Sequence, residues 1–426
     1  MSASSTASIS STPAAPALAG SALPLGIGVA GLAVAAAGFF IDGPQAAAAG
    51  WLTAIVFWVG IAVGMLFLIM LGYIFDAGWS VVLRRQLEHG VSVFKWLALL
   101  FVPLLLLSWF YQRGLIWRWM DPSFDFAGIG GHGTVATDIL YGKKSGFLSI
   151  GFFTVRAVAY FGIWIGLAAV FRRNSFSQDS DGDPKWTLSS RKWAAAGLAL
   201  TAVSSTFAVI DWVKSLEYHW FSTMYGVWYF ANGIRGALSM LALISIVGLA
   251  RGTFTGVVNR THLYDVGKLM LAFTIFWAYI TFSQYFLIWN ANVPEETFWY
   301  NLREVLHTGE ASQWKWVGMA ILFGFFLVPF LYLLSYKAKV TPKLLAPVAI
   351  WILALSLLDV CYNVLPFRKD AAGDALPFLS LQLVWTLAAV AGVGGICVWS
   401  YLRSFPTSKL IPIRDPRIGE SLNHRE

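Results

Sequence analysis

The 426-residue sequence contains only two cysteines, Cys361 and Cys397, and they form no CxxC pair. An iron–sulfur cluster normally needs four thiolates, so two cysteines are too few to hold such a cluster. The six histidines all fall in expected loops or near expected helix ends, so no pair is placed to ligate a b-type haem at mid-membrane. They are His89, His132, His219, His262, His307 and His424.

Nucleotide-binding loops are also missing from the sequence. There is no Walker A loop, and the glycines around His132 lie in an expected loop without a strand–turn–helix setting. No residue pattern predicts a metal site or a catalytic group. We therefore expect the chain to bind no cofactor of its own, and any electrons it handles must arrive through a partner or a diffusible carrier.

Charged residues are scarce, at 12% of the chain, whereas 58% of residues are hydrophobic. Soluble domains usually contain about 25% charged residues. A bilayer core about 30 Å thick needs roughly 20 mostly apolar residues per helix, and ten such windows recur along the chain. They cover residues 25–41, 51–75, 94–111, 147–171, 193–213, 225–249, 269–289, 316–336, 345–365 and 378–401.

These long apolar runs predict an all-α integral membrane protein of ten transmembrane helices, because only helices satisfy their own backbone groups in lipid. We expect residues 1–24 to form a disordered tail, residues 25–402 the transmembrane domain and residues 403–426 a basic tail. The first 20 residues carry no Lys or Arg, which disfavours a signal peptide. The C-terminal tail is expected to lie along lipid headgroups or under a partner.

Most Lys and Arg outside the windows fall in the C-terminal tail and in the loops expected on the same side as both termini. The positive-inside rule then places both termini in the cytoplasm, as in a multi-pass protein of the bacterial inner membrane. The formal net charge of +8 follows from this topology. It does not indicate a nucleic-acid partner.

Several ionisable residues lie within or beside the windows, where charge costs at least ~2.5 kcal/mol at mid-membrane. An acid near each face and an arginine at depth suit proton movement, whereas the alternative is structural ion pairs or snorkelling. Arg235 is near mid-depth, and Arg156 and Asp359 lie in the outer halves of their windows. The remaining candidates are Asp76 and Lys268 at cytoplasmic ends, and Asp211, Glu217 and His219 at an outer end.

The seventh window carries Thr281, Ser283, Gln284 and Tyr285 within an otherwise apolar and aromatic run. Ser283 and Gln284 could extend a water or proton wire. The alternative is hydrogen bonding between helices of a bundle. The sequence alone leaves both interpretations open.

Two long motifs lie at expected outer helix ends. Residues 211–226 read D-W-x-K-S-L-E-x-H-W-F-S-T-x-Y-G, and residues 282–297 read F-x-Q-Y-x-L-I-W-x-x-N-x-P-E-E-T. These stretches resemble the ActF membrane subunits of bacterial alternative complex III, which are related to the NrfD/polysulfide-reductase anchor family. The resemblance spans the second to tenth windows. The motif residues are Asp211, Glu217, His219, Ser283, Gln284, Tyr285, Glu295 and Glu296.

The resemblance implies a respiratory complex that oxidises menaquinol or ubiquinol and reduces cytochrome c or a similar acceptor. Haem c and iron–sulfur clusters would lie in partner subunits, beside a sister NrfD-like subunit. Helices two to five and six to nine would form two four-helix bundles. Such subunits are discussed as proton conduits, so we expect a cofactor-free subunit that performs no redox chemistry itself and acts in proton conduction and structural support.

Two other functions remain open from the sequence. The chain could bind quinone directly, with Glu217 and His219 at the headgroup. It could instead be a free-standing secondary transporter, which would favour broken helices in matched positions. Pro103, Pro329 and Pro347 indicate kinks but form no matched pair.

Overall fold

The structure is a computed structural model that describes residues 22–425. Ten helices in this range are long and apolar enough to cross a membrane, and the range contains no β-strand. The prediction of an all-α integral membrane protein is confirmed. The expected N-terminal tail, residues 1–24, lies almost wholly outside the described residues.

Each of the ten spans overlaps one of the predicted windows, and several extend well beyond it. The fourth span, helix α6, ends ten residues after its window, and the seventh span, helix α9, begins nine residues before its window. Polar residues continue both helices past the apolar run. The spans are α1 (Ala22–Ile41), α2 (Pro44–Ile74), Gly78–Tyr111 with α3 (Val81–Gly90) and α4 (Phe94–Leu106), α6 (Ile150–Asp181), α7 (Lys185–Trp212), α8 (Tyr225–Ala250), α9 (Arg260–Ala291), Gln313–Leu334 with α11 (Gln313–Ala320) and α12 (Val328–Leu334), α14 (Pro342–Val364) and α15 (Leu381–Ser404).

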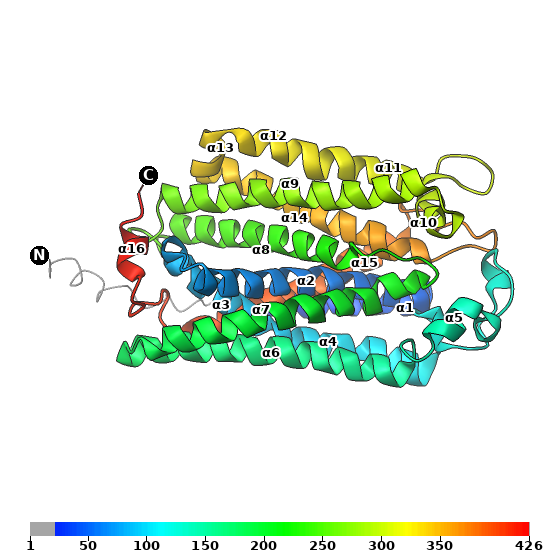
Figure 1. The fold of residues 1–426 in the computed structure, drawn as a ribbon, viewed down its shortest axis with the longest axis horizontal. Coiled ribbons are helices and arrows are strands. Elements are labelled where there is room, and N and C mark those ends of the chain that lie inside the picture. The colour runs from blue at the N-terminus through cyan, green and yellow to red at the C-terminus, as the bar shows by residue number, and fades with distance from the viewer. Residues whose placement is uncertain (1–21, 426) are drawn as a thin grey trace, which may run out of the picture.

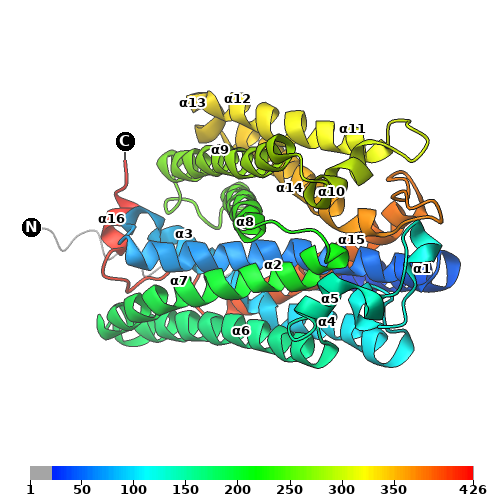
Figure 2. The same cartoon turned by 45° about the vertical axis from the view of Figure 1, so that its right-hand side comes forward.

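The spans form two four-helix bundles, as Figures 1 and 2 show. The first bundle contains α2, α3–α4, α6 and α7, and the second contains α8, α9, α11–α12 and α14. The bundles meet where α2 packs against α8, and Gly64 and Gly233 stand face to face there. A side chain at either glycine would collide with the opposite backbone, so these glycines permit the close approach.

The first and last spans, α1 and α15, pack against each other and cover α2. A Cβ on Gly31 would lie 2.6 Å from the backbone nitrogen of Gly392, so the two backbones are nearly in contact. Trp58 of α2 donates from Nε1 to the carbonyl oxygen of Val390 at 2.9 Å. The α2 helix is therefore enclosed on all sides, whereas α1 keeps most of its surface exposed.

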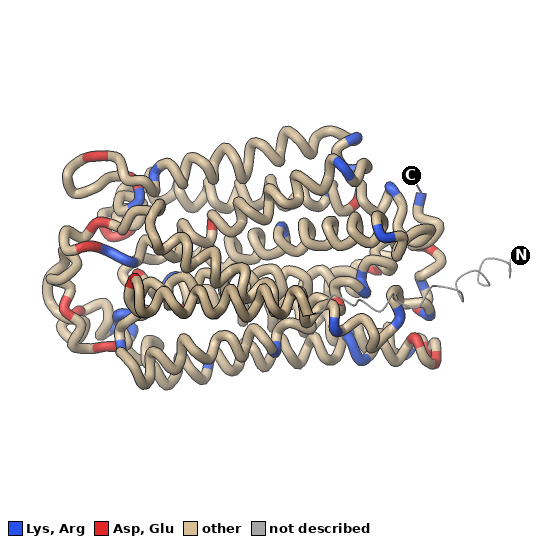
Figure 3. The backbone as a smooth tube through the Cα atoms, turned by 180° about the vertical axis from the view of Figure 1, so that it is seen from behind, with Lys and Arg blue, Asp and Glu red and all other residues tan. Residues whose placement is uncertain are grey.

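Charged residues gather at the two ends of the molecule, with few between them (Figure 3). We call the end that carries α16 (Ile418–Leu422) the C-terminal face. The opposite end, the loop face, carries the short helices α5 (Ile139–Lys144) and α10 (Pro294–Glu304). This distribution is the one expected of a protein with an apolar belt between two aqueous surfaces.

The C-terminal strap, residues 408–425, lies across the C-terminal face, packed against the bundles. Arg84 forms an ion pair with Asp415, and Arg85 donates from Nη1 to the carbonyl oxygen of Lys409 at 3.0 Å. At the far end of the strap, His424 Nε2 is 2.6 Å from Asp265 Oδ2 of α9. The strap thus connects the ends of both bundles.

Candidate functional site

A stripe of polar and aromatic residues runs along one side of α8 and faces the interior of the second bundle. The spacing alternates between three and four residues, which keeps all five side chains on one helix face. All five are buried. We call these residues the α8 stripe: Tyr225, Trp228, Asn232, Arg235 and Ser239.

Asp359 of α14 meets this stripe and is only 3% exposed. Its Oδ2 atom accepts three hydrogen bonds, from Trp228 Nε1 at 2.9 Å, Asn232 Nδ2 at 3.0 Å and Trp277 Nε1 at 3.1 Å. Among residues 22–425, its Oδ1 atom accepts only a longer bond of 3.4 Å, from Asn363 Nδ2. Every donor is electrically neutral. The carboxylate is thus held firmly through one oxygen and loosely through the other.

Arg235 lies one helical turn beyond Asn232 and is 1% exposed. Its Nη2 atom donates to the carbonyl oxygen of Phe325 at 2.7 Å, and its guanidinium carbon lies 3.7 Å from the centre of the Phe325 ring. Pro329 has no N–H to donate to the carbonyl four residues earlier, so the Phe325 oxygen is open to another donor. Pro329 therefore leaves the Phe325 carbonyl oxygen available to accept the hydrogen bond from Arg235.

The other nitrogens of Arg235, Nε and Nη1, have no hydrogen-bond partner among residues 22–425. Within the same range, no carboxylate lies at salt-bridge distance from this guanidinium. The second bundle thus buries an acid and a base separately.

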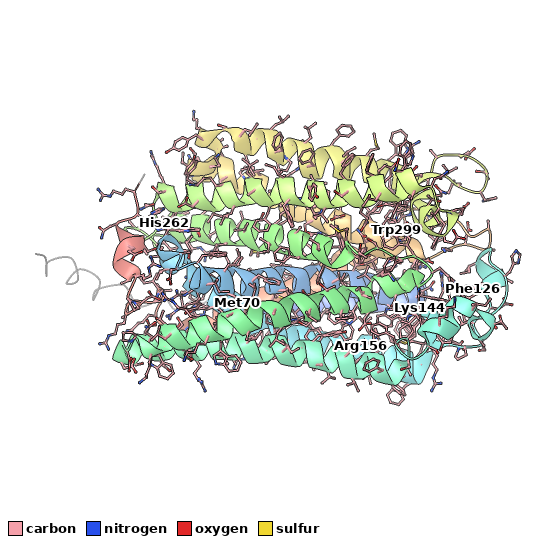
Figure 4. The ribbon with its side chains drawn as sticks, in the orientation of Figure 1. Met70, Phe126, Lys144, Arg156, His262 and Trp299 are labelled. Atoms are coloured by element: carbon pink, nitrogen blue, oxygen red, sulfur yellow. The ribbon has the colours of Figure 1, made fainter. Side chains whose placement is uncertain are left out.

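The first bundle joins two of its buried ionisable residues, Arg156 and Asp211, directly. Arg156 of α6 donates from Nε to Asp211 Oδ2 and from Nη2 to Asp211 Oδ1, both at 2.8 Å. Tyr160 donates its hydroxyl to Asp211 Oδ2 at 2.7 Å. The Arg156 guanidinium carbon also lies 3.8 Å from the centre of the Phe147 ring. Figure 4 labels Arg156 on the part of α6 nearer the loop face. The two candidates from separate windows are therefore one bidentate ion pair between α6 and α7.

Glu217 and His219 lie at the loop face, where they line a cleft of about 1020 Å³. Glu217 Oε1 is 3.0 Å from Lys369 Nζ and 3.6 Å from Arg118 Nη1. Burial raises the pKa of Glu217, but the positive charges of Lys369 and Arg118 lower this pKa by more than burial raises it. The net shift of the pKa is therefore downward. Glu217 is thus held as a carboxylate between two cations.

Two His–Asp pairs flank this cleft, one from the loops of each bundle. His219 Nε2 is 2.5 Å from Asp138 Oδ2, and His307 Nδ1 is 2.6 Å from Asp374 Oδ2. The hydrogen bond and charge of Asp374 raise the pKa of His307. For Asp138, burial raises the pKa, but hydrogen bonds from Tyr218 and the His219 ring lower it on balance.

The candidate residues Ser283, Gln284 and Tyr285 of α9 have different surroundings. Gln284 is buried; its Oε1 accepts from the Ser222 hydroxyl at 2.7 Å, and its Nε2 donates to Tyr300 at 3.2 Å. Ser283 is half-buried and Tyr285 is exposed. Gln284 therefore links the two motif stretches, while its neighbours point to the sides of the helix.

Asp76 and Lys268 both lie at the C-terminal face. Asp76, in a left-handed turn with φ 49°, pairs with Arg191 and with Arg417, whose Nη1 is 3.5 Å from Oδ1. Lys268 Nζ is 2.7 Å from Asp265 Oδ1. Both side chains are substantially exposed, so these pairs are surface features of the C-terminal face.

Sequence reasoning identified Asp359 and Arg235 but missed the neutral groups around them. The three-and-four spacing of Trp228, Asn232 and Arg235 within one apolar run was a signal that could have been used. The partners of Glu217, Arg118 and Lys369, gave no such signal, because each lies in a different loop.

Together, the ten spans and their charge distribution define a multi-pass α-helical membrane protein. No protein-family model matches the chain, and no curated protein matches it. Over residues 22–425, no group of three or more His, Cys, Asp or Glu side chains is arranged to hold a metal ion.

Proposed function

We propose that this chain is a cofactor-free membrane subunit of a quinol:cytochrome c, or similar acceptor, oxidoreductase of the bacterial inner membrane, with both termini cytoplasmic. Haem c and iron–sulfur clusters are then carried by partner subunits, including a sister NrfD-like subunit. The two motif stretches of residues 211–226 and 282–297 support this assignment. So does the arrangement of spans two to five and six to nine in two bundles.

In this proposal the chain conducts protons through the second bundle, and the observation that carries it is the buried Asp359 with no cation in contact. A carboxylate bound only by neutral donors can gain or lose a proton without breaking an ion pair. Asp211 cannot, because protonation would remove its attraction to Arg156. Protonation of Asp359 would fall on Oδ1, the oxygen with only one long hydrogen bond.

The neighbours of Asp359 extend the path in both directions along α8. Toward the loop face, Asn363 Oδ1 accepts a hydrogen bond of 3.0 Å from the Tyr225 hydroxyl. Toward the C-terminal face, Arg235 is followed by Ser239, whose buried hydroxyl has no partner among the described side chains and backbone. Buried water commonly fills such gaps between polar groups. The cationic Arg235 would separate the two half-paths.

The test is Asp359→Asn in the assembled complex, reconstituted into proteoliposomes. The amide oxygen can still accept from Trp228, Asn232 and Trp277, so folding and assembly should be preserved. We expect fewer protons translocated per electron, with quinol oxidation unchanged in the presence of an uncoupler. Asp374→Asn makes the same chemical change at the loop face and should leave the proton stoichiometry intact.

Two results would contradict this proposal. One is a wild-type proton stoichiometry from an intact Asp359→Asn complex. The other is purification of the chain from its native membrane without haem-containing partners, which would favour the free-standing transporter instead.

Direct quinone binding is the second candidate, and one observation favours it. Glu217 and His219, the two predicted headgroup residues, line the same cleft, together with the aromatic rings of Phe126 and Phe298. Its size is that of a typical ligand site. A photo-reactive quinone should then label residues 217–219 of this chain, and Glu217→Gln should reduce that labelling. Labelling confined to the sister subunit would exclude this role.

A further inference from the structure

Four side chains form a continuous row across the boundary between α4 and α15 at the C-terminal face. Lys95 Nζ lies 5.6 Å from the centre of the Trp96 ring, and Arg403 Cζ lies 5.2 Å from the centre of the Trp399 ring. The two indole rings meet edge to face, with their centres 5.0 Å apart. The row therefore places two Trp side chains between two cations.

The helices are held together at this point by a hydrogen bond between the hydroxyls of Ser92 and Ser400, 3.1 Å apart. Ser92 lies about one helical turn before Trp96, and Ser400 directly follows Trp399. The spacing of the row is thus fixed by contacts between the two spans. It does not depend on the conformation of a loop.

Lys95 and Arg403 are exposed, and no carboxylate of residues 22–425 lies at salt-bridge distance from either. Two other arginines at this face are paired with carboxylates: Arg84 with Asp415, and Arg417 with Glu420. The row is thus a local excess of positive charge at the ends of two membrane spans. An anion is the partner that this charge would attract.

The surface beside the row is apolar and faces outward from the bundle. Leu99 and Val102 of α4 are 58% and 39% exposed, and Val398 of α15 is 40% exposed. Trp side chains favour the depth of lipid headgroups, where the ring is in an apolar environment and the N–H is near water. A ligand that fits here has an anionic head and a long apolar body.

We propose that this row, Lys95, Trp96, Trp399 and Arg403, binds an anionic phospholipid, with its headgroup lying over the row, flanked by the two cations, and an acyl chain along Leu99 and Val398. Basic groups between spans are a known means of holding such headgroups. A zwitterionic lipid is a poorer ligand because its own ammonium group offsets the phosphate. The site is independent of proton conduction.

The test measures lipid retention by native mass spectrometry, on the intact chain with any subunits that copurify. We expect bound phosphatidylglycerol in the wild type and roughly 25-fold weaker binding in Lys95→Gln/Arg403→Gln, at about fivefold per basic residue. The matched control is Lys337→Gln/Lys343→Gln, which removes the same charge from exposed residues elsewhere on this face and should retain the lipid. Lys95→Arg/Arg403→Lys should also retain it.

Further arms identify the ligand. Phosphatidylcholine should bind weakly to wild type and double variant alike, and inorganic phosphate should not displace phosphatidylglycerol. Asp359→Asn should retain the lipid, so failure of the proton proposal would not affect this one. The proposal is overturned if the double variant binds phosphatidylglycerol as the wild type does, if inorganic phosphate displaces the lipid, or if a photo-crosslinker at position 99 couples to protein only.

Discussion

The first bundle buries an acid against an arginine, whereas the second buries an acid and an arginine apart. Asp211 and Asp359 both lie near the loop-face end of the fourth span of their bundle. Asp211 accepts from Arg156 and Tyr160, and Asp359 accepts from two indoles and an amide. The first arrangement suits a permanent connection between helices. The second leaves the Asp359 carboxylate able to take up a proton without breaking an ion pair.

Removing the arginine of the first bundle should have the largest effect on stability. Arg156→Leu leaves Asp211 buried with one hydroxyl donor, and breaking a buried ion pair by deleting one partner costs about 3–5 kcal/mol. We expect a loss of this size in the unfolding free energy in detergent micelles. The double variant Arg156→Leu/Asp211→Leu should recover much of the loss. Equal stability of the single and double variants would contradict the argument.

Removing the arginine of the second bundle should have a much smaller effect. Arg235→Leu loses one hydrogen bond, to the Phe325 carbonyl, which is worth about 1 kcal/mol, and it also removes a buried charge that lacks a counter-ion. We expect the unfolding free energy to stay within about 1 kcal/mol of the wild type. A loss as large as that of Arg156→Leu would show that both bundles depend on their arginines alike.

The smallest effect is expected at the loop face, where each bundle contributes one His–Asp pair. Because Asp374 raises the pKa of His307 and His307 lowers that of Asp374, the charged pair stabilises the loops fully between the usual pKa values of the two groups, and this contribution is lost as pH rises through the raised pKa of His307. In an NMR titration, His307 should titrate above its usual value of about 6.5, and Asp374→Asn should return it there. An unchanged titration in Asp374→Asn would refute the assignment.

The spans were predictable because a long apolar run in lipid has only one stable conformation, the helix. Arg235 and Asp359 were also visible, since charge stands out in such a run. The separation of Arg235 from Asp359 could not be predicted, because it depends on how α8 and α14 are rotated against each other in the bundle. The position of Arg235 depends on Pro329, 94 residues away, through the carbonyl that this proline leaves free.

The expected tail, residues 403–426, was predicted from its basic and proline-containing composition, which is also typical of segments along a membrane surface. Composition does not specify that Asp415 meets Arg84 or that His424 meets Asp265. Both pairs join residues more than 150 positions apart. Only the three-dimensional arrangement of the bundle ends brings them together.

The contact of α1 and α15 around α2 has a consequence for biosynthesis. Trp58 and Val390, joined by a hydrogen bond, are separated by 332 residues. At about 5–20 residues per second, translation between them takes roughly 17–66 s. During that time the surface of α1 around Gly31 and the surface of α2 around Trp58 are not yet covered by α15. Lipid or an insertion factor must shield both until the last span arrives.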